Sequence, residues 1–290
     1  MESFLQQVFA GVTSGAVYAS LGVALVMIYR ATGHLNFAQG ELATLCTFIA
    51  FTLVNLGVPY WLALAATLAI SFAGGAALWS YIVKPIGNSS RTAPIAALIG
   101  VLLIVNSAVG LIWGHDTQTY PSPFEKLTFL KSSFLQPHEV GTLAVVVVVA
   151  VLLQVFFRYT KLGLAMRACA ENPNSSHLVG IPVNNMLAIG WGISTALGGL
   201  AGILVAPIVY LEPNMMGGIL IYGFAAALLG GISNPLGALA GGVIVGVAEN
   251  LIGFYVIGTE VKLSIALLLI IAILLFKPAG LFGRTVASRV

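Results

Sequence analysis

Long apolar runs with few charged residues between them dominate this sequence. The runs at 143–157 and 261–276, taken with their flanking residues, approach the ~20 residues that cross a bilayer as a helix. Only 7% of the 290 residues are charged and 59% are hydrophobic, so the chain has too few charges to cover a soluble protein of this size. The sequence therefore predicts an all-α polytopic membrane protein.

Nine apolar segments predict about 8–9 transmembrane helices. They lie at 6–29, 41–57, 60–83, 93–114, 141–159, 184–211, 217–232, 235–257 and 261–277. Prolines fall between or at the ends of several segments, where helices are expected to stop. The second and seventh segments are short. Each of them could span the membrane or re-enter it from one side.

The basic residues predict the orientation. With the N-terminus outside, the C-terminus in the cytoplasm and all nine segments crossing, nine of the twelve Lys and Arg residues face the cytoplasm, as the positive-inside rule requires. Those nine are Arg30, Lys84, Arg91, Arg158, Lys161, Arg167, Lys277, Arg284 and Arg289, and the external three are Lys126, Lys131 and Lys262. We expect one transmembrane domain over 1–290, with an external loop at 115–140 and a cytoplasmic loop at 160–183.

Motifs for catalysis and for metal or nucleotide binding are missing from the sequence. It contains no Gly-Lys pair and hence no P-loop, no His-Glu-x-x-His and no Gly-x-Ser-x-Gly. The four histidines are isolated in or near loops, the two cysteines read as packing residues, and no basic cluster interleaved with aromatic residues suggests nucleic acid. We therefore expect no catalytic residue, metal or cofactor in this chain.

Polar residues at membrane depth are the candidates for function. Asn36, Gln39 and Glu41 lie in one stretch between Gly33 and Gly40. Broken backbone of this kind is tolerated at depth where it is buried in protein or lines water. The alternative is a plain cytoplasmic turn, with Glu41 in the first turn of the next helix, where the helix dipole favours an acid.

Three further polar residues lie inside apolar segments: Asn106 in the fourth, and Glu249 with Asn250 in the eighth. A carboxylate in hydrocarbon is costly and normally faces a cavity or a partner. Each of these residues could line a solute path or form a buried hydrogen bond between helices.

The cytoplasmic loop carries the clearest local signals. Asn172 suits an N-cap, Pro173 the first helical position and Gly180 the stop, which predicts a short helix at about 173–179. It would be either a docking element for a soluble partner or a mere connector. Elsewhere, glycine pairs four residues apart, such as Gly11 with Gly15, predict close helix packing.

Four stretches together resemble a known family. They are LNFAQGELATL at 35–45, MRACAENPNSSHLVGI at 166–181, LLGGISNPLGALAGGVIVGVAENL at 228–251 and FKPAGLFG at 276–283. In this order they resemble the permease subunits of branched-chain amino acid ABC importers, the LivH-like family.

The resemblance implies a permease of the bacterial inner membrane, in contact with lipid. It would pair with a second homologous permease, two cytoplasmic ATPases that bind ATP and Mg, and an extracytoplasmic solute-binding protein. It implies that residues 167–181 dock on the ATPase. The candidate coupling residues are Arg167, Glu171, Asn172, Pro173, His177, Leu178 and Gly180, and the candidate pathway residues are Asn36, Gln39, Glu41, Asn106, Glu249 and Asn250.

Other functions stay open at this point. The same family includes permeases for urea and short-chain amides. A secondary transporter could use Glu41 and Glu249 for ion coupling, and a small-solute channel is a further alternative. An intramembrane enzyme is disfavoured because no nucleophile and base are paired.

Overall fold

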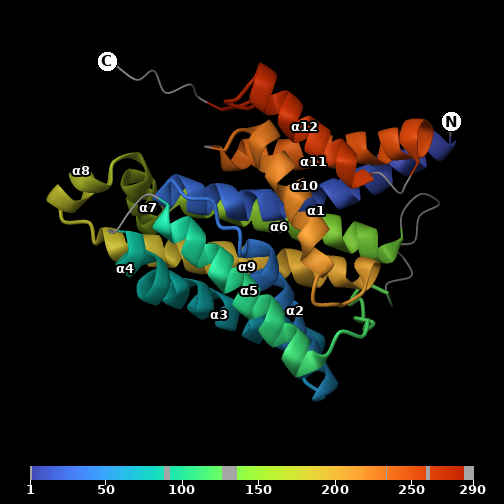
Figure 1. Cartoon of the computed structure of the whole chain (residues 1–290), viewed down its shortest axis with the longest axis horizontal. Helices are drawn as coiled ribbons and strands as arrows, with labels where there is room; N and C mark the ends of the chain where they lie inside the picture. Colours follow the sequence, from blue (N-terminus) through green and yellow to red (C-terminus); the bar gives the residue numbers. More distant parts are fainter. Residues whose placement is uncertain (1, 88–91, 126–135, 233, 259–261, 284–290) are drawn as a thin grey trace. The chain divides into compact units, whose positions relative to one another are not determined.

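The computed structural model describes residues 2–87, 92–125, 136–232, 234–258 and 262–283, and Figure 1 shows them as a set of helices. Within these ranges the only strand-like pairing is an isolated antiparallel bridge between Gln118 and Leu211. The elements are α1 Glu2–Thr32, α2 Gln39–Asn55, α3 Tyr60–Leu78, η1 Trp79–Val83, α4 Lys84–Gly87, α5 Ala93–Trp113, α6 Pro137–Tyr159, α7 Lys161–Glu171, α8 Pro173–Leu178, α9 Val183–Val209, α10 Met215–Gly230, α11 Pro235–Ile252, η3 Gly253–Ile257 and α12 Lys262–Phe276.

Each of the nine predicted apolar segments contains a helix, which ends one or more residues before the predicted end in five of them. Six helical stretches of the described residues are long and apolar enough to cross a membrane, and α10 and α12 are shorter apolar helices. The shorter α2 has 17 residues. The full span count and the orientation stay predictions, and Arg91, Lys126, Lys131, Arg284 and Arg289 lie outside the described residues.

The chain forms two compact units, each assembled from separate stretches of sequence. The first unit comprises Met1–Val26, Phe124–Val146 and Gly218–Val290, and the second comprises Met27–Pro123 and Val147–Gly217. Each unit thus combines helices that are distant in sequence.

Helix α9 forms the centre of the second unit, where α2 and α3 pack against it. Trp191 of α9 is fully buried, and its ring centroid lies 6.0 Å from that of Trp79. Close approach depends on glycine: a Cβ atom on Gly75 of α3 would lie 2.6 Å from the carbonyl oxygen of Trp191. A side chain at position 75 would therefore not fit between the two helices, and glycine lets the backbones of α3 and α9 come close together.

Glycine packing also holds the first unit together. A Cβ atom on Gly15 of α1 would lie 2.7 Å from the carbonyl oxygen of Gly242, and one on Gly11 would lie 2.7 Å from Cα of Val247. The predicted close packing at this glycine pair is confirmed.

Candidate functional site

The helix break after α1 runs from the exposed Gly33 to the buried Asn36 and Gln39 of the second unit. Gly33 ends the helical path with φ +71°, a conformation that favours glycine. Asn36 then accepts a hydrogen bond at Oδ1 from the backbone N–H of Ala38 (3.1 Å) and donates from Nδ2 to Oε1 of Gln39 (3.0 Å). The side chain of Asn36 thus fixes the turn that leads into α2.

Gln39 ties this turn to α9. Its Nε2 donates to the backbone carbonyl of Ser194 (3.0 Å), and it lies against Gly198, where no side chain stands in the way. Asn36 and Gln39 are both fully buried, and each bonds to other protein groups. This geometry suits a fixed support for α2, since polar groups buried with their partners rigidify a site.

A second polar group forms around Asn106 of α5. Its Nδ2 lies 3.1 Å from Oε2 of Glu41, 2.9 Å from Oδ1 of Asn214 and 3.4 Å from the carbonyl oxygen of Pro213. We call these four residues the Asn106 cluster. They join the first turn of α2, the middle of α5 and the connection between α9 and α10.

The Asn106 cluster lies well inside the length of α5. Asn106 is roughly 20 Å from the first residue of this helix and roughly 10 Å from the last, at 1.5 Å per residue. Helix α2 runs beside the later part of α5, because Thr52 also accepts a hydrogen bond from Nε1 of Trp113 (2.8 Å). Helix α2 therefore begins near the middle of a membrane-length helix, and Glu41 lies at that level.

The other buried acid, Glu249, lies in the first unit beside a lysine. Nζ of Lys262 is 3.8 Å from Oε1 of Glu249 and donates to Oδ1 of Asn250 (3.2 Å). The hydroxyl groups of Tyr18 and Tyr222 also interact with the Glu249 carboxylate, and their rings stack at a centroid distance of 4.6 Å. Glu249 and Asn250 thus serve an ion-paired contact between α11 and α12.

The structure therefore sorts the predicted pathway residues into three groups. Asn36 and Gln39 form one, Glu41 and Asn106 belong to another, and Glu249 with Asn250 form the third in the other unit. Sequence reasoning missed Asn214, which follows the proline expected to separate two helices. It also treated Lys262 only as an external base, although its position in an apolar segment was a signal that it needs a partner.

The cytoplasmic-loop prediction of a short helix is confirmed. Helix α8 covers Pro173–Leu178, the side chain of Asn172 accepts a hydrogen bond from the N–H of Ser175 (2.9 Å), and Gly180 has φ +83°. Helix α7 precedes it and was not predicted. Cys169 and Ser176 hydrogen-bond between these two helices, and burial raises the pKa of the Cys169 thiol above its ordinary value, which keeps it protonated.

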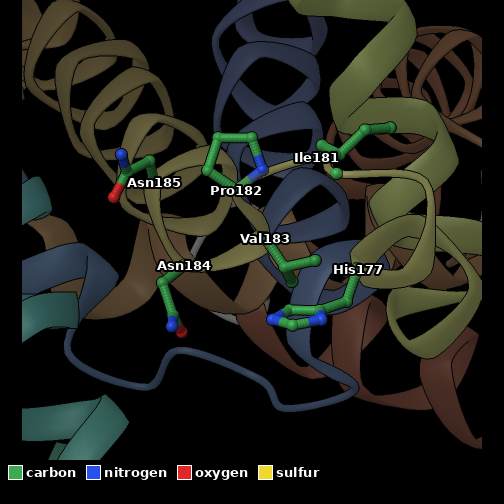
Figure 2. A pocket seen from close by; sticks show the side chains of 7 residues that line it. His177, Ile181, Pro182, Val183, Asn184 and Asn185 are labelled. Carbon is green, nitrogen blue, oxygen red and sulfur yellow. The ribbon is translucent and has the colours of Figure 1, made fainter.

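The outer face of α8 is exposed. The side chain of Leu178 is 86% accessible, and Val179 and His177 are also exposed. A surface pocket lies next to it, where Figure 2 shows the side chain of His177 together with those of residues 181–185, which lead into α9. On α7, Glu171 attracts Arg30 in the last turn of α1 electrostatically, whereas Arg167 repels it.

The comparisons with known proteins cover nearly the whole chain. A family model described as "Branched-chain amino acid transport system / permease component" matches residues 7–274. The chain is 33% identical to the high-affinity branched-chain amino acid transport system permease protein LivH of Salmonella typhimurium, over 99% of this chain and 98% of that protein. It is 31% identical to BraD of Pseudomonas aeruginosa, which carries the same description, over the same shares of the two chains.

A more distant relative and a solved structure extend the comparison. The xylose/arabinose import permease protein XylH of Sulfolobus acidocaldarius is 27% identical over 82% of this chain and 67% of its own. A structure described as "PsaBC from Streptococcus pneumoniae in complex with Fab" superposes with a TM-score of 0.50 at 14% identity, covering 93% of this chain and 91% of that one. At this identity the match concerns the fold alone.

Proposed function

Because the chain belongs to the branched-chain amino acid transport permease family, we propose that it carries branched-chain or other small amino acids across the bacterial inner membrane as part of an ABC importer. The observation that carries this proposal is the family match over residues 7–274. The apolar helices of the described residues supply the membrane-spanning part.

The importer needs partners that this chain does not contain. We expect a second homologous permease to complete the path, two cytoplasmic ATPases to bind ATP and Mg, and an extracytoplasmic binding protein to deliver the solute. The N-terminus would be external and the C-terminus cytoplasmic, which leaves nine of twelve basic residues inside. In this orientation α7 and α8 lie on the ATPase side.

Two features of the second unit support a route from the ATPase to the solute path. Glu171 of α7 attracts Arg30 electrostatically, and α1 ends two residues after Arg30, at the helix break. The break leads through Asn36 and Gln39 to Glu41 at the start of α2. A displacement of α7 and α8 by the ATPase would therefore act on the segment that positions Glu41.

Reconstitution tests the proposed function. The permease pair with its ATPases in proteoliposomes should accumulate radiolabelled leucine only when ATP and loaded binding protein are present. This chain alone should neither hydrolyse ATP nor accumulate solute, because its sequence has no P-loop. Accumulation of leucine by the chain alone, driven by a proton or sodium gradient, would contradict the proposal. Preferential uptake of urea or acetamide by the complex would instead assign the chain to the urea and short-chain amide permeases of the same family.

Leu178→Asp tests the docking role of α8. Leu178 is 86% exposed, so the change should leave folding intact, whereas a charge buried in a docking interface is strongly unfavourable. We expect loss of the ATPase during purification, or at least about a tenfold loss of stimulated hydrolysis. Leu56→Asp is the matched control, because Leu56 is 74% exposed in the turn between α2 and α3, on the predicted external side. If the Leu178→Asp variant retains its ATPase and shows full stimulated ATP hydrolysis, α8 is a connector and not a docking element.

A further inference from the structure

Around Nδ2 of Asn106, hydrogen-bond acceptors outnumber the available hydrogens. Three oxygen atoms, from Glu41, Asn214 and the Pro213 carbonyl, converge on Nδ2 of Asn106, which carries only two hydrogens. The opposite orientation of the Asn106 amide would turn its own oxygen toward the Glu41 carboxylate and the Pro213 carbonyl, so these two oxygens favour the amide as it stands. Each of the three oxygens keeps at least one lone pair for another donor.

In its ionised form, Glu41 gives the cluster a negative charge that no basic side chain of the cluster neutralises. Glu41 is 8% exposed, and its side chain receives its hydrogen bond from the neutral amide of Asn106. The dipole at the start of α2 supplies only about half a positive charge. The other buried acid, Glu249, has a cation beside it, because Nζ of Lys262 lies 3.8 Å from its carboxylate.

The cluster is accessible at one edge. Asn214 is exposed and Asn106 is partly exposed, while Glu41 is buried beneath them. At Gly217, three residues after Asn214, a Cβ atom would meet no other atom within 4 Å. On the side of Asn214, the described part of this chain therefore does not cover the cluster.

From this geometry we propose that the Asn106 cluster binds the ammonium group of an amino-acid solute, with Glu41 as its counter-ion. An ammonium supplies three N–H donors for these oxygens and the one positive charge that none of the four cluster residues carries. The Pro213 carbonyl and Oδ1 of Asn214 accept the remaining hydrogens. This inference rests on the proposed function, since it assigns one chemical group of the transported solute to named side chains.

Site protection in the assembled transporter tests the proposal. A Gly217→Cys variant of the permease, in complex with its second permease and ATPases in nanodiscs, is labelled with a maleimide. Both native cysteines are buried and should react slowly. Leucine and 3-methylbutylamine should slow the labelling, because both carry an ammonium group. The isosteric acid 4-methylpentanoate should not slow it.

Two charge variants identify the counter-ion. Glu41→Gln should raise the half-protecting concentration of 3-methylbutylamine by at least about tenfold, because it removes the charge opposite the ammonium. Glu41→Asp, which keeps the charge, should raise it much less. Glu212→Gln is the matched control: Glu212 lies two residues before Asn214 in the same connection, outside the cluster, and its loss should leave protection unchanged.

Several results would overturn the proposal. These are equal protection by 4-methylpentanoate, protection by sodium chloride but not by potassium chloride, unchanged protection in Glu41→Gln, or loss of protection in Glu212→Gln. If the Glu41→Gln variant fails to assemble, the Gly217→Cys protein still tests the proposal. Protection by 3-methylbutylamine is then compared with protection by 4-methylpentanoate. ATP-driven leucine uptake separates the two levels: uptake without ammonium protection refutes only this site, whereas no uptake by the intact complex refutes the proposed function.

Discussion

Lys262→Met is expected to destabilise the folded permease by about 3 kcal/mol. Nζ of Lys262 lies 3.8 Å from the Glu249 carboxylate, whose side chain is 6% exposed. Removing the lysine leaves a buried, unpaired charge, and breaking a buried pair on one side costs about 3–5 kcal/mol. The free energy of unfolding in detergent, measured by tryptophan fluorescence during denaturant titration, checks this.

The two partners should respond unequally. The side chain of Lys262 is 28% exposed and can extend toward water, so Glu249→Gln should cost only about 1 kcal/mol. In the double variant Glu249→Gln with Lys262→Met, most of the loss should be recovered. Lys277→Met, at an exposed lysine just after α12, is the control and should change stability by less than about 0.5 kcal/mol. A double variant as unstable as Lys262→Met would show that the ion pair is not the cause.

Gly75→Ala and Gly74→Ala are expected to change stability in opposite directions. A Cβ atom on Gly75 would lie 2.6 Å from the Trp191 carbonyl oxygen and would separate α3 from α9, at a cost of about 2–3 kcal/mol from overpacking. Gly74, its neighbour in α3, is exposed with no atom within 4 Å of such a Cβ. Alanine there should stabilise the helix by about 0.5 kcal/mol.

Unfolding of the two purified variants under identical detergent conditions measures this difference. The two changes add the same methyl group one residue apart, so helix propensity and detergent effects are matched. Equal stability of the variants would mean that α3 and α9 do not pack as closely as described.

Hydrophobic pattern and caps predicted most of the helices. Apolar runs predicted nine helical segments, because a spanning helix must be apolar over most of its length. Asn172, Pro173 and Gly180 predicted α8, because caps act through neighbouring backbone atoms. Helix α7 was missed: its Lys161–Glu171 sequence is short, with apolar residues on one face only, so no long apolar run marks it.

The candidate site could be predicted only in part. Glu41, Asn106 and Glu249 stood out because polar side chains are costly in an apolar segment. Which of them meet was not predictable, since Glu41 and Asn106 are 65 residues apart in sequence. Their different roles follow from their neighbours: Glu249 received Lys262, whereas Glu41 received an amide.

The sequence alone determined the membrane setting, the helical segments and the family resemblance, because each depends on composition or on residues close in the chain. The tertiary structure alone decided that α2 begins near the middle of α5, that Asn36 and Gln39 are buried supports, and that Asn214 joins Glu41 at Asn106. Gln39 reaches α9 where Gly198 leaves room for it, and Glu41, Asn106 and Asn214 meet although they are far apart in the chain, so no local pattern encodes these pairings.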